Sequence, residues 1–254
     1  MMNVLKSEIK RGLFSYKFVL CFVGVAIVLF PTIIGFLRDN ETGSWFLLET
    51  ALRGSGIETT IYFIFPVLPF ALSYAMEKEA HADRFLCIRS GVLPYAISKL
   101  LVAAITGFLT LFCGMFLFVA VYLPSRSLLT EIHAGGVYME WAAEGHEWGG
   151  FILALIHYSL SGMITAVCAI WASSLVANKY VAAATPTILY ATILRFSSQA
   201  DVFAAWNPLY WIAGIHYAET VGETFLIKVI TTLVLCTLMG VFTCINIQRR
   251  FVNE

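Results

Sequence analysis

Residues 77–99 read Glu-Lys-Glu-Ala-His-Ala-Asp-Arg-Phe-Leu-Cys-Ile-Arg-Ser-Gly-Val-Leu-Pro-Tyr-Ala-Ile-Ser-Lys, and they form a charged island in an apolar chain. The segments on either side of this island, 59–76 and 100–123, contain no charged residue. Two long uncharged segments joined by a charged one are typical of membrane-spanning helices connected by an aqueous loop. The stretch therefore predicts an all-α integral membrane protein with one internal loop built to meet water.

The composition of the whole chain supports the membrane class. Hydrophobic residues make up 59% of the sequence, charged residues 13%, and the mean hydropathy is +0.82. A soluble domain carries about 25% charged residues, so this chain has too much apolar surface to bury in one aqueous core. The formal net charge is zero, which gives no electrostatic basis for nucleic-acid binding. The composition therefore predicts that the protein is surrounded by lipid.

Hydropathy and length predict six membrane-spanning helices, at residues 18–37, 59–76, 100–123, 151–176, 180–198 and 228–248. Residues 1–17 combine four basic residues with apolar ones at three- and four-residue spacing. This pattern predicts an amphipathic helix on the inner membrane surface or, alternatively, the start of the first span. Residues 199–223 are rich in aromatic side chains around Asn207-Pro208, which predicts an external re-entrant or interfacial segment before the last span.

The basic residues predict the orientation of these spans. With both termini inside, eleven of the sixteen Lys and Arg residues fall on the cytoplasmic side: Lys6, Lys10, Arg11, Lys17, Lys78, Arg84, Arg89, Lys99, Lys179, Arg249 and Arg250. An excess of basic residues on one side is the strongest sequence signal for the cytoplasmic face. We therefore expect a multi-pass protein of the bacterial cytoplasmic membrane, with acidic external loops at 38–58 and 124–150.

The first half of the island is predicted to form a short helix that ends at Gly91 and Pro94. Such a helix brings Phe85, Leu86 and Ile88 near one another and leaves Asp83 and Arg84 facing water. Two interpretations stay open on the residues alone. The island is either a docking element that receives force from a soluble protein, or an ordinary loop that is basic because cytoplasmic loops are basic.

Several function classes lack the residues that they need. Ion-driven carriers need ionisable groups at membrane depth, and the predicted spans hold only His157, with Arg195 and Lys228 near the outer ends of the fifth and last spans. The chain contains no Gly-Lys dipeptide and so no phosphate loop of the usual form, and no compact metal-ligand spacing occurs. We therefore expect no cofactor or metal in this chain.

The sequence Ser159-Leu160-Ser161-Gly162 is faintly similar to the serine motif of rhomboid proteases. Those enzymes pair the serine with a histidine in the sixth span, and the sixth predicted span here has none. His157 lies four residues before Ser161 on the same helix, a poor geometry for an activated pair. Ser161 is therefore predicted to be a small residue that allows close helix packing, and an enzymatic function is not expected.

Two patterns together resemble a known family. The island has the form Glu-x-Glu, Arg-Phe-Leu, Arg-Ser-Gly-Val and Tyr-x-x-x-Lys across residues 77–99, and an aromatic Asn-Pro-Leu-Tyr stands at 207–210 before the last span. With six spans and a basic amphipathic N-terminus, the chain resembles the membrane (permease) subunit of type-two ABC exporters. The resemblance covers nearly the whole chain, and its motifs are loose patterns rather than catalytic signatures.

The resemblance implies a partner, a mechanism and a set of residues. Residues 77–88 would correspond to the coupling helix that seats in a groove of a separate cytoplasmic ATPase, and ATP and Mg²⁺ would be bound by that subunit. Family members work with two membrane subunits, so a second permease copy or a homologous permease is expected. The expected ATPase interface comprises Glu77, Glu79, Asp83, Arg84, Phe85, Leu86, Ile88 and Arg89.

The implied mechanism is alternating access, in which closure of the ATPase subunits tilts the spans and opens an outward path. The apolar spans favour a lipid, a hydrophobic drug or an amphipathic peptide as substrate, because nothing in them would compensate the desolvation of a charged one. The candidate substrate path comprises Pro66, Pro69, Ser161 and Pro186. A membrane scaffold without transport activity remains the alternative, and a rhomboid-like intramembrane protease is a more distant one.

Overall fold

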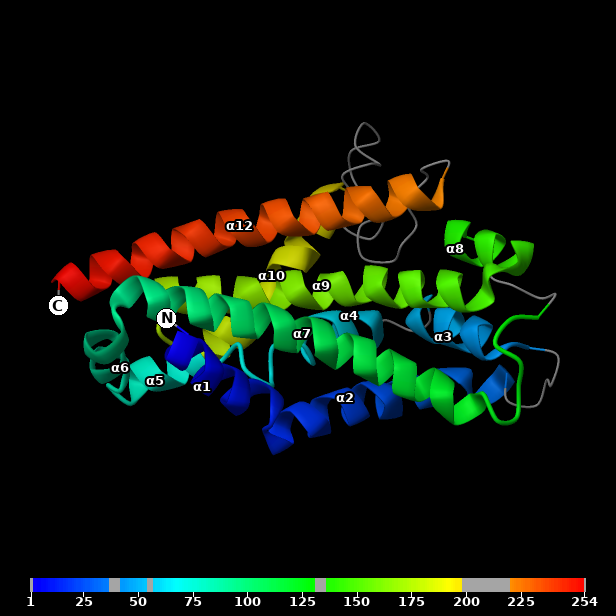
Figure 1. Ribbon diagram of the computed structural model, residues 1–254, viewed down its shortest axis with the longest axis horizontal. Coiled ribbons are helices and arrows are strands. Elements are labelled where there is room, and N and C mark those ends of the chain that lie inside the picture. Colours follow the sequence, from blue (N-terminus) through cyan, green and yellow to red (C-terminus); the bar gives the residue numbers. More distant parts are fainter. Residues whose placement is uncertain (1, 37–41, 54–56, 131–135, 198–219, 254) are drawn as a thin grey trace.

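The computed structural model describes residues 2–36, 42–53, 57–130, 136–197 and 220–253. These residues are helical throughout, with short turns and no strand, which confirms the all-α prediction for the described part of the chain (Figure 1). The elements are α1 (Met2–Leu13), α2 (Tyr16–Leu29), the 3-10 helix η1 (Phe30–Phe36), α3 (Ser44–Arg53), α4 (Ile57–Phe63), α5 (Ser73–Glu79), α6 (Asp83–Ser90), α7 (Val92–Tyr122), α8 (Val137–Trp141), the π-helix η2 (Ala142–His146), α9 (Glu147–Leu175), α10 (Lys179–Ser197) and α12 (Val221–Asn253).

The long helices α7, α9 and α12 run along the long axis of the molecule, with α2 beside α7 (Figure 1). Helices α1, α5 and α6 gather at one end, where α12 also ends, and we call this the α6 end. Helices α3 and α8 lie at the opposite end, the α3 end. Both termini of the described chain are thus at the same end of the bundle. That this end faces the cytoplasm stays a prediction.

Helices α7 and α9 touch backbone to backbone at two glycines. A Cβ atom built on Gly107 would lie 2.4 Å from the carbonyl oxygen of Gly162, and one built on Gly162 would lie 2.5 Å from the oxygen of Gly107. No real side chain fits at these distances, so both positions require glycine. Small residues at such crossings let membrane helices gain close packing that lipid cannot provide. This contact sets the centre of the bundle.

Among the described residues, four helical segments are long and apolar enough to cross a membrane: Tyr16–Phe36, Val92–Tyr122, Val137–Leu175 and Val221–Phe251. They correspond to the first, third, fourth and sixth predicted spans. The fifth prediction, 180–198, corresponds to α10, a helix of 19 residues with Pro186 inside it. The count of six spans therefore stays a prediction.

The second predicted span, 59–76, is not one continuous helix. Helix α4 ends at Phe63 and α5 begins at Ser73, with irregular turns around Pro66 and Pro69 between them. Proline lacks the backbone N–H of a regular helix, and its ring clashes with the preceding turn. Most of the segment is buried in protein, where such irregular backbone is tolerated at membrane depth.

Three further boundaries differ from the prediction. Helix α7 begins at Val92, so the last third of the 77–99 island belongs to a long helix because Pro94 occupies its first turn, where no N–H partner is lost. Residues 44–53 of the predicted external loop fold into α3, which buries Trp45 and Glu49 against the bundle. The predicted re-entrant segment, 199–223, lies mostly outside the described residues, and α12 begins at Val221.

The predicted N-terminal helix is present as α1, and it is separate from the first span. The helical conformation is interrupted at Phe14 and Ser15. The Ser15 hydroxyl then caps the start of α2 by accepting a hydrogen bond from the N–H of Phe18 at 3.3 Å. Leu5 and Ile9 pack against the core between α7 and α9. Helix α1 is therefore an integral part of the α6 end.

Candidate functional site

Four charged side chains meet at the junction of α1, α5 and α7. The ammonium of Lys99 lies 2.6 Å from Glu77 Oε1 and 3.0 Å from Glu8 Oε2. The guanidinium of Arg11 lies 2.7 Å from Glu77 Oε1 and 3.2 Å from Glu8 Oε1. Tyr95 donates a hydrogen bond to Glu77 Oε2 at 2.6 Å. We call these four charged residues the ion cluster.

The ion cluster is electrically balanced and largely buried. Lys99 is fully buried, and Glu8 and Glu77 are nearly so, while Arg11 reaches the surface. Burial alone would raise the pKa of Glu77, but the charge and hydrogen bond of Lys99, with hydrogen bonds from Tyr95 and Arg11, hold this pKa below its usual value. Burial opposes the charge of Arg11 too, and the two carboxylates outweigh it and raise its pKa. The carboxylate of Glu77 is therefore ionised at neutral pH.

Sequence reasoning placed Glu77 and Lys99 at the ends of an aqueous loop and left Glu8 unassigned. The signal that it missed is the position of Glu8 between Leu5 and Ile9, on the face of α1 that packs against the bundle. A lone acid on an apolar face implies a buried cation elsewhere in the chain. Lys99, an isolated charge at the start of a long apolar segment, is that cation.

Helix α6 projects between two points that this cluster anchors. On one side the chain leaves Glu77 through a tight turn, in which His81 has a left-handed backbone (φ +54°) and the N–H of Ala82 donates to the carbonyl of Glu77 at 2.9 Å. On the other side Gly91 (φ +83°) ends α6 and leads into the first turns of α7, which carry Tyr95. Both ends of α6 are therefore connected to the elements that carry the ion cluster.

The outward side of α6 combines apolar and basic side chains. Phe85 is 77% exposed and Ile88 is 76% exposed, and Arg84 and Arg89 are exposed beside them. Apolar side chains of this size on a helix flanked by cations are typical of a protein contact surface. We call these four residues the α6 face.

The other predicted interface residues do not belong to this face. Glu77 is a member of the ion cluster, and Asp83 is buried, with Oδ2 3.4 Å from the ammonium of Lys78. Leu86 is half-buried against the small core formed by Tyr74, Cys87 and Tyr95. Glu79 is exposed but pairs with Lys179 at the start of α10, at 3.7 Å. The expectation that Asp83 faces water is corrected, because Asp83 is buried where α6 begins, while Arg84 is exposed as predicted.

Cys87, on the inward side of α6, has no catalytic character. Burial raises the pKa of its thiol to about 11, and the negative charges of Asp83 and Glu77 act in the same direction. The thiol is therefore protonated at neutral pH and packs as a small apolar group.

The predicted substrate-path residues are all buried, and they lie on three elements. Pro66 and Pro69 stand in the irregular segment between α4 and α5, Ser161 in α9 and Pro186 inside α10. Pro69 lines a cavity of about 360 Å³ that Arg11 and Glu77 also line. One residue of the expected path thus lies next to the ion cluster.

The structure adds a contact to the prediction for Ser161. Its hydroxyl accepts a hydrogen bond from the ammonium of Lys228 at 2.8 Å, so Ser161 is a polar partner as well as a small residue. Lys228 is 2% exposed, and its place near the outer end of the last span stays a prediction. A signal was present in the sequence: Thr224, Lys228 and Thr232 recur every four residues on the buried side of α12.

His157 takes part in a different contact. Its Nδ1 atom lies 3.0 Å from the hydroxyl of Tyr138, so the structure pairs it with α8 and does not pair it with Ser161. At the same end, Tyr158 and Trp45 donate hydrogen bonds to the buried carboxylate of Glu49. These contacts attach α3 and α8 to α9 and make the α3 end a packed cap.

Three comparisons with known proteins complete the description of the site. No protein-family model, no curated protein and no solved structure matches this chain.

Proposed function

We propose that this chain is the membrane subunit of an ATP-driven exporter and that the α6 face is the surface on which a separate ATPase subunit docks. The observation that carries the proposal is the construction of α6: Phe85 and Ile88 are exposed on a short helix whose two ends are held by a buried ion cluster. A helix that only connected two spans would need neither the exposed apolar side chains nor the rigid anchors.

The mechanism that we propose is alternating access driven from the α6 face. Closure of two ATPase subunits, each seated on one permease copy, would displace α6, and the ion cluster would carry the displacement into α1, α5 and α7. Hydrolysis then resets the bundle. The substrate that the apolar spans favour is a lipid, a hydrophobic drug or an amphipathic peptide, moved across the bacterial cytoplasmic membrane. ATP and Mg²⁺ belong to the partner subunit.

Replacing Phe85 and Ile88 together with Asp should abolish transport and weaken binding of the ATPase about tenfold or more, because a charged side chain cannot enter an apolar groove. Ile88 is chosen rather than Leu86 because Leu86 is half-buried, and a charge placed there would disturb folding. The measurement is co-purification of the double variant with a candidate ATPase subunit that co-purifies with wild type, followed by ATPase activity in proteoliposomes.

The matched control is Tyr180→Asp, which charges a similarly exposed side chain (73%) at the start of α10. It should leave ATPase binding unchanged. If the F85D/I88D variant still binds and exports like wild type, α6 is an ordinary connecting helix. A chain that folds and inserts but never binds an ATPase would instead favour the scaffold alternative.

A second function has one observation in its favour. The contact between Lys228 and Ser161 places a candidate base beside a candidate nucleophile, which is the first requirement of a serine hydrolase. The exporter proposal expects no reaction of Ser161 with a fluorophosphonate probe, since both side chains are buried among helices. Labelling of the wild type that disappears in Ser161→Ala and in Lys228→Met would establish the intramembrane hydrolase instead.

A further inference from the structure

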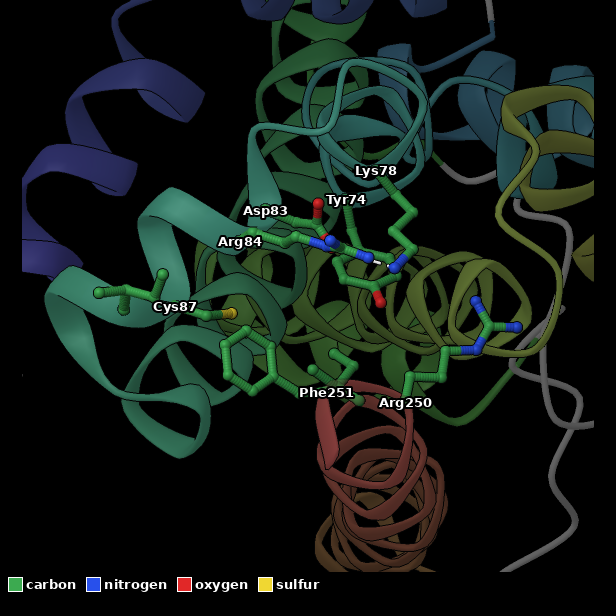
Figure 2. A pocket seen from close by; sticks show the side chains of 9 residues that line it. Tyr74, Lys78, Asp83, Arg84, Cys87, Arg250 and Phe251 are labelled. Carbon is green, nitrogen blue, oxygen red and sulfur yellow. Dashed lines mark ion pairs between the residues drawn. The ribbon is translucent and has the colours of Figure 1, made fainter. Parts of the chain in front are cut away.

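A cavity of about 230 Å³ opens at the α6 end, and three basic side chains line it from three different helices (Figure 2). Lys78 comes from α5, Arg84 from α6 and Arg250 from the last turn of α12. In Figure 2 the side chains of Lys78 and Arg84 approach each other beside Asp83, and Arg250 extends from α12 to one side of them. Since a water molecule occupies roughly 30 Å³ in the liquid, the cavity has room for a much larger polar group.

The lining is net positive. Among the described residues that line it, Asp83 is the one carboxylate against three basic side chains, and its Oδ2 lies 3.4 Å from the ammonium of Lys78. Arg250 donates one hydrogen bond to the carbonyl of Leu175 at the end of α9, and a guanidinium has five N–H donors. Two guanidinium groups and one ammonium around a small cavity are the donor set that recognises phosphate oxygens.

The remaining wall of the cavity is apolar and continues onto the surface of α12. Ile247 is buried in the cavity wall, and Phe251 is 37% exposed at its rim. In the most apolar stretch of Val221–Phe251, only 11% of the residues are buried. Most apolar side chains of α12 are therefore on the surface of the bundle. A headgroup in the cavity would therefore have its acyl chains beside a surface that already requires lipid.

We propose that this cavity binds a phosphate group, with Arg84 and Arg250 as its main ligands and the headgroup of an anionic phospholipid as its source. The cavity adjoins the α6 face, because Arg84 and Ile88 belong to that face and also line the cavity. The inference needs only that the chain resides in a membrane, and it holds with or without an ATPase partner.

The test compares two double variants of the full chain that remove the same charge from the same two helices. The first is R84Q/R250Q, whose positions line the cavity. The second is R89Q/R249Q, whose positions are exposed and lie outside this cavity lining. Each protein is exchanged into a mixture of phosphatidylglycerol and phosphatidylcholine with identical acyl chains, and retained lipid is counted by native mass spectrometry without any partner protein.

Wild type and R89Q/R249Q should retain phosphatidylglycerol over phosphatidylcholine, and R84Q/R250Q should lose this preference by about fivefold or more. A wild type without preference, or an equal loss in both variants, overturns the proposal because the effect would then be general surface charge. The single variants R84Q and R250Q supply the same comparison if the first double variant does not fold.

A second arm distinguishes lipid from free phosphate. In phosphatidylcholine alone, inorganic phosphate is added while the midpoint of thermal unfolding is measured for the same three proteins. The lipid source predicts no shift in any of them. A shift in wild type and R89Q/R249Q that R84Q/R250Q lacks, without selective lipid retention, would keep the phosphate site and reject the lipid.

Discussion

Lys99→Met should lower the free energy of unfolding by about 3–5 kcal/mol, the largest stability effect that we expect in this chain. Lys99 is fully buried and is bonded to Glu77 and Glu8, so its loss leaves two buried carboxylates with Arg11 as their cation. Methionine has similar length and packs well, so the effect reports charge and not a cavity. Thermal unfolding of the purified protein in detergent measures it.

The matched control is Lys6→Met, the same replacement at an exposed position of α1. A surface change of this kind should stay within about 0.5 kcal/mol of wild type. The double variant K99M/E8Q keeps the Glu77–Arg11 pair and restores neutrality, so it should be more stable than K99M alone. If K99M and K6M unfold at the same temperature, the ion cluster does not hold the α6 end together.

The pH dependence of stability follows from the lowered pKa of Glu77. A carboxyl group whose pKa is lower in the folded than in the unfolded state stabilises the fold above its unfolded value, here 4.5. That contribution should be complete at neutral pH and be lost as pH falls below 4.5 through the lower folded pKa. In K99M the largest favourable charge on Glu77 is gone, so the folded pKa should rise toward the unfolded value and the loss of stability on acidification should be smaller than in wild type.

Gly162→Ala should destabilise the protein by about 1–3 kcal/mol, although it adds a single methyl group. That methyl would stand 2.5 Å from the carbonyl oxygen of Gly107, and neither backbone can move without separating α7 from α9. Because these two helices form the centre of the bundle, transport should fall together with stability. The midpoint of thermal unfolding and export activity are the two measurements.

Gly240→Ala provides the control, since a Cβ there meets only Leu100 Cδ1 at 3.6 Å. This variant makes the same chemical change in the middle of α12 and should be neutral, or stabilising by up to about 1 kcal/mol through the better helix propensity of alanine. Equal behaviour of G162A and G240A would show that the helices α7 and α9 do not pack as closely as described.

Much of the fold was accessible from the sequence because hydropathy is a local property. The four apolar helices that can cross a membrane were each predicted, although α7 and α12 begin seven or eight residues earlier than expected. The segment 59–76 was predicted as one span, and the structure shows that its helix is interrupted around Pro66 and Pro69, so its crossing of the membrane stays a prediction. A short helix is present within the charged island as α6, but Glu77 and Asp83 are buried and do not face water.

The sequence by itself determined the class of the protein, its helical content, the apolar segments and the exposed charged turn near α6, since each depends on the transfer energy of residues within one short window. Only the tertiary structure decided that Glu8 and Lys99, 91 residues apart, form a buried ion pair, and that Lys228 of α12 donates a hydrogen bond to Ser161 of α9. A buried charge is stable only beside its partner, and the identity of that partner depends on how the helices pack.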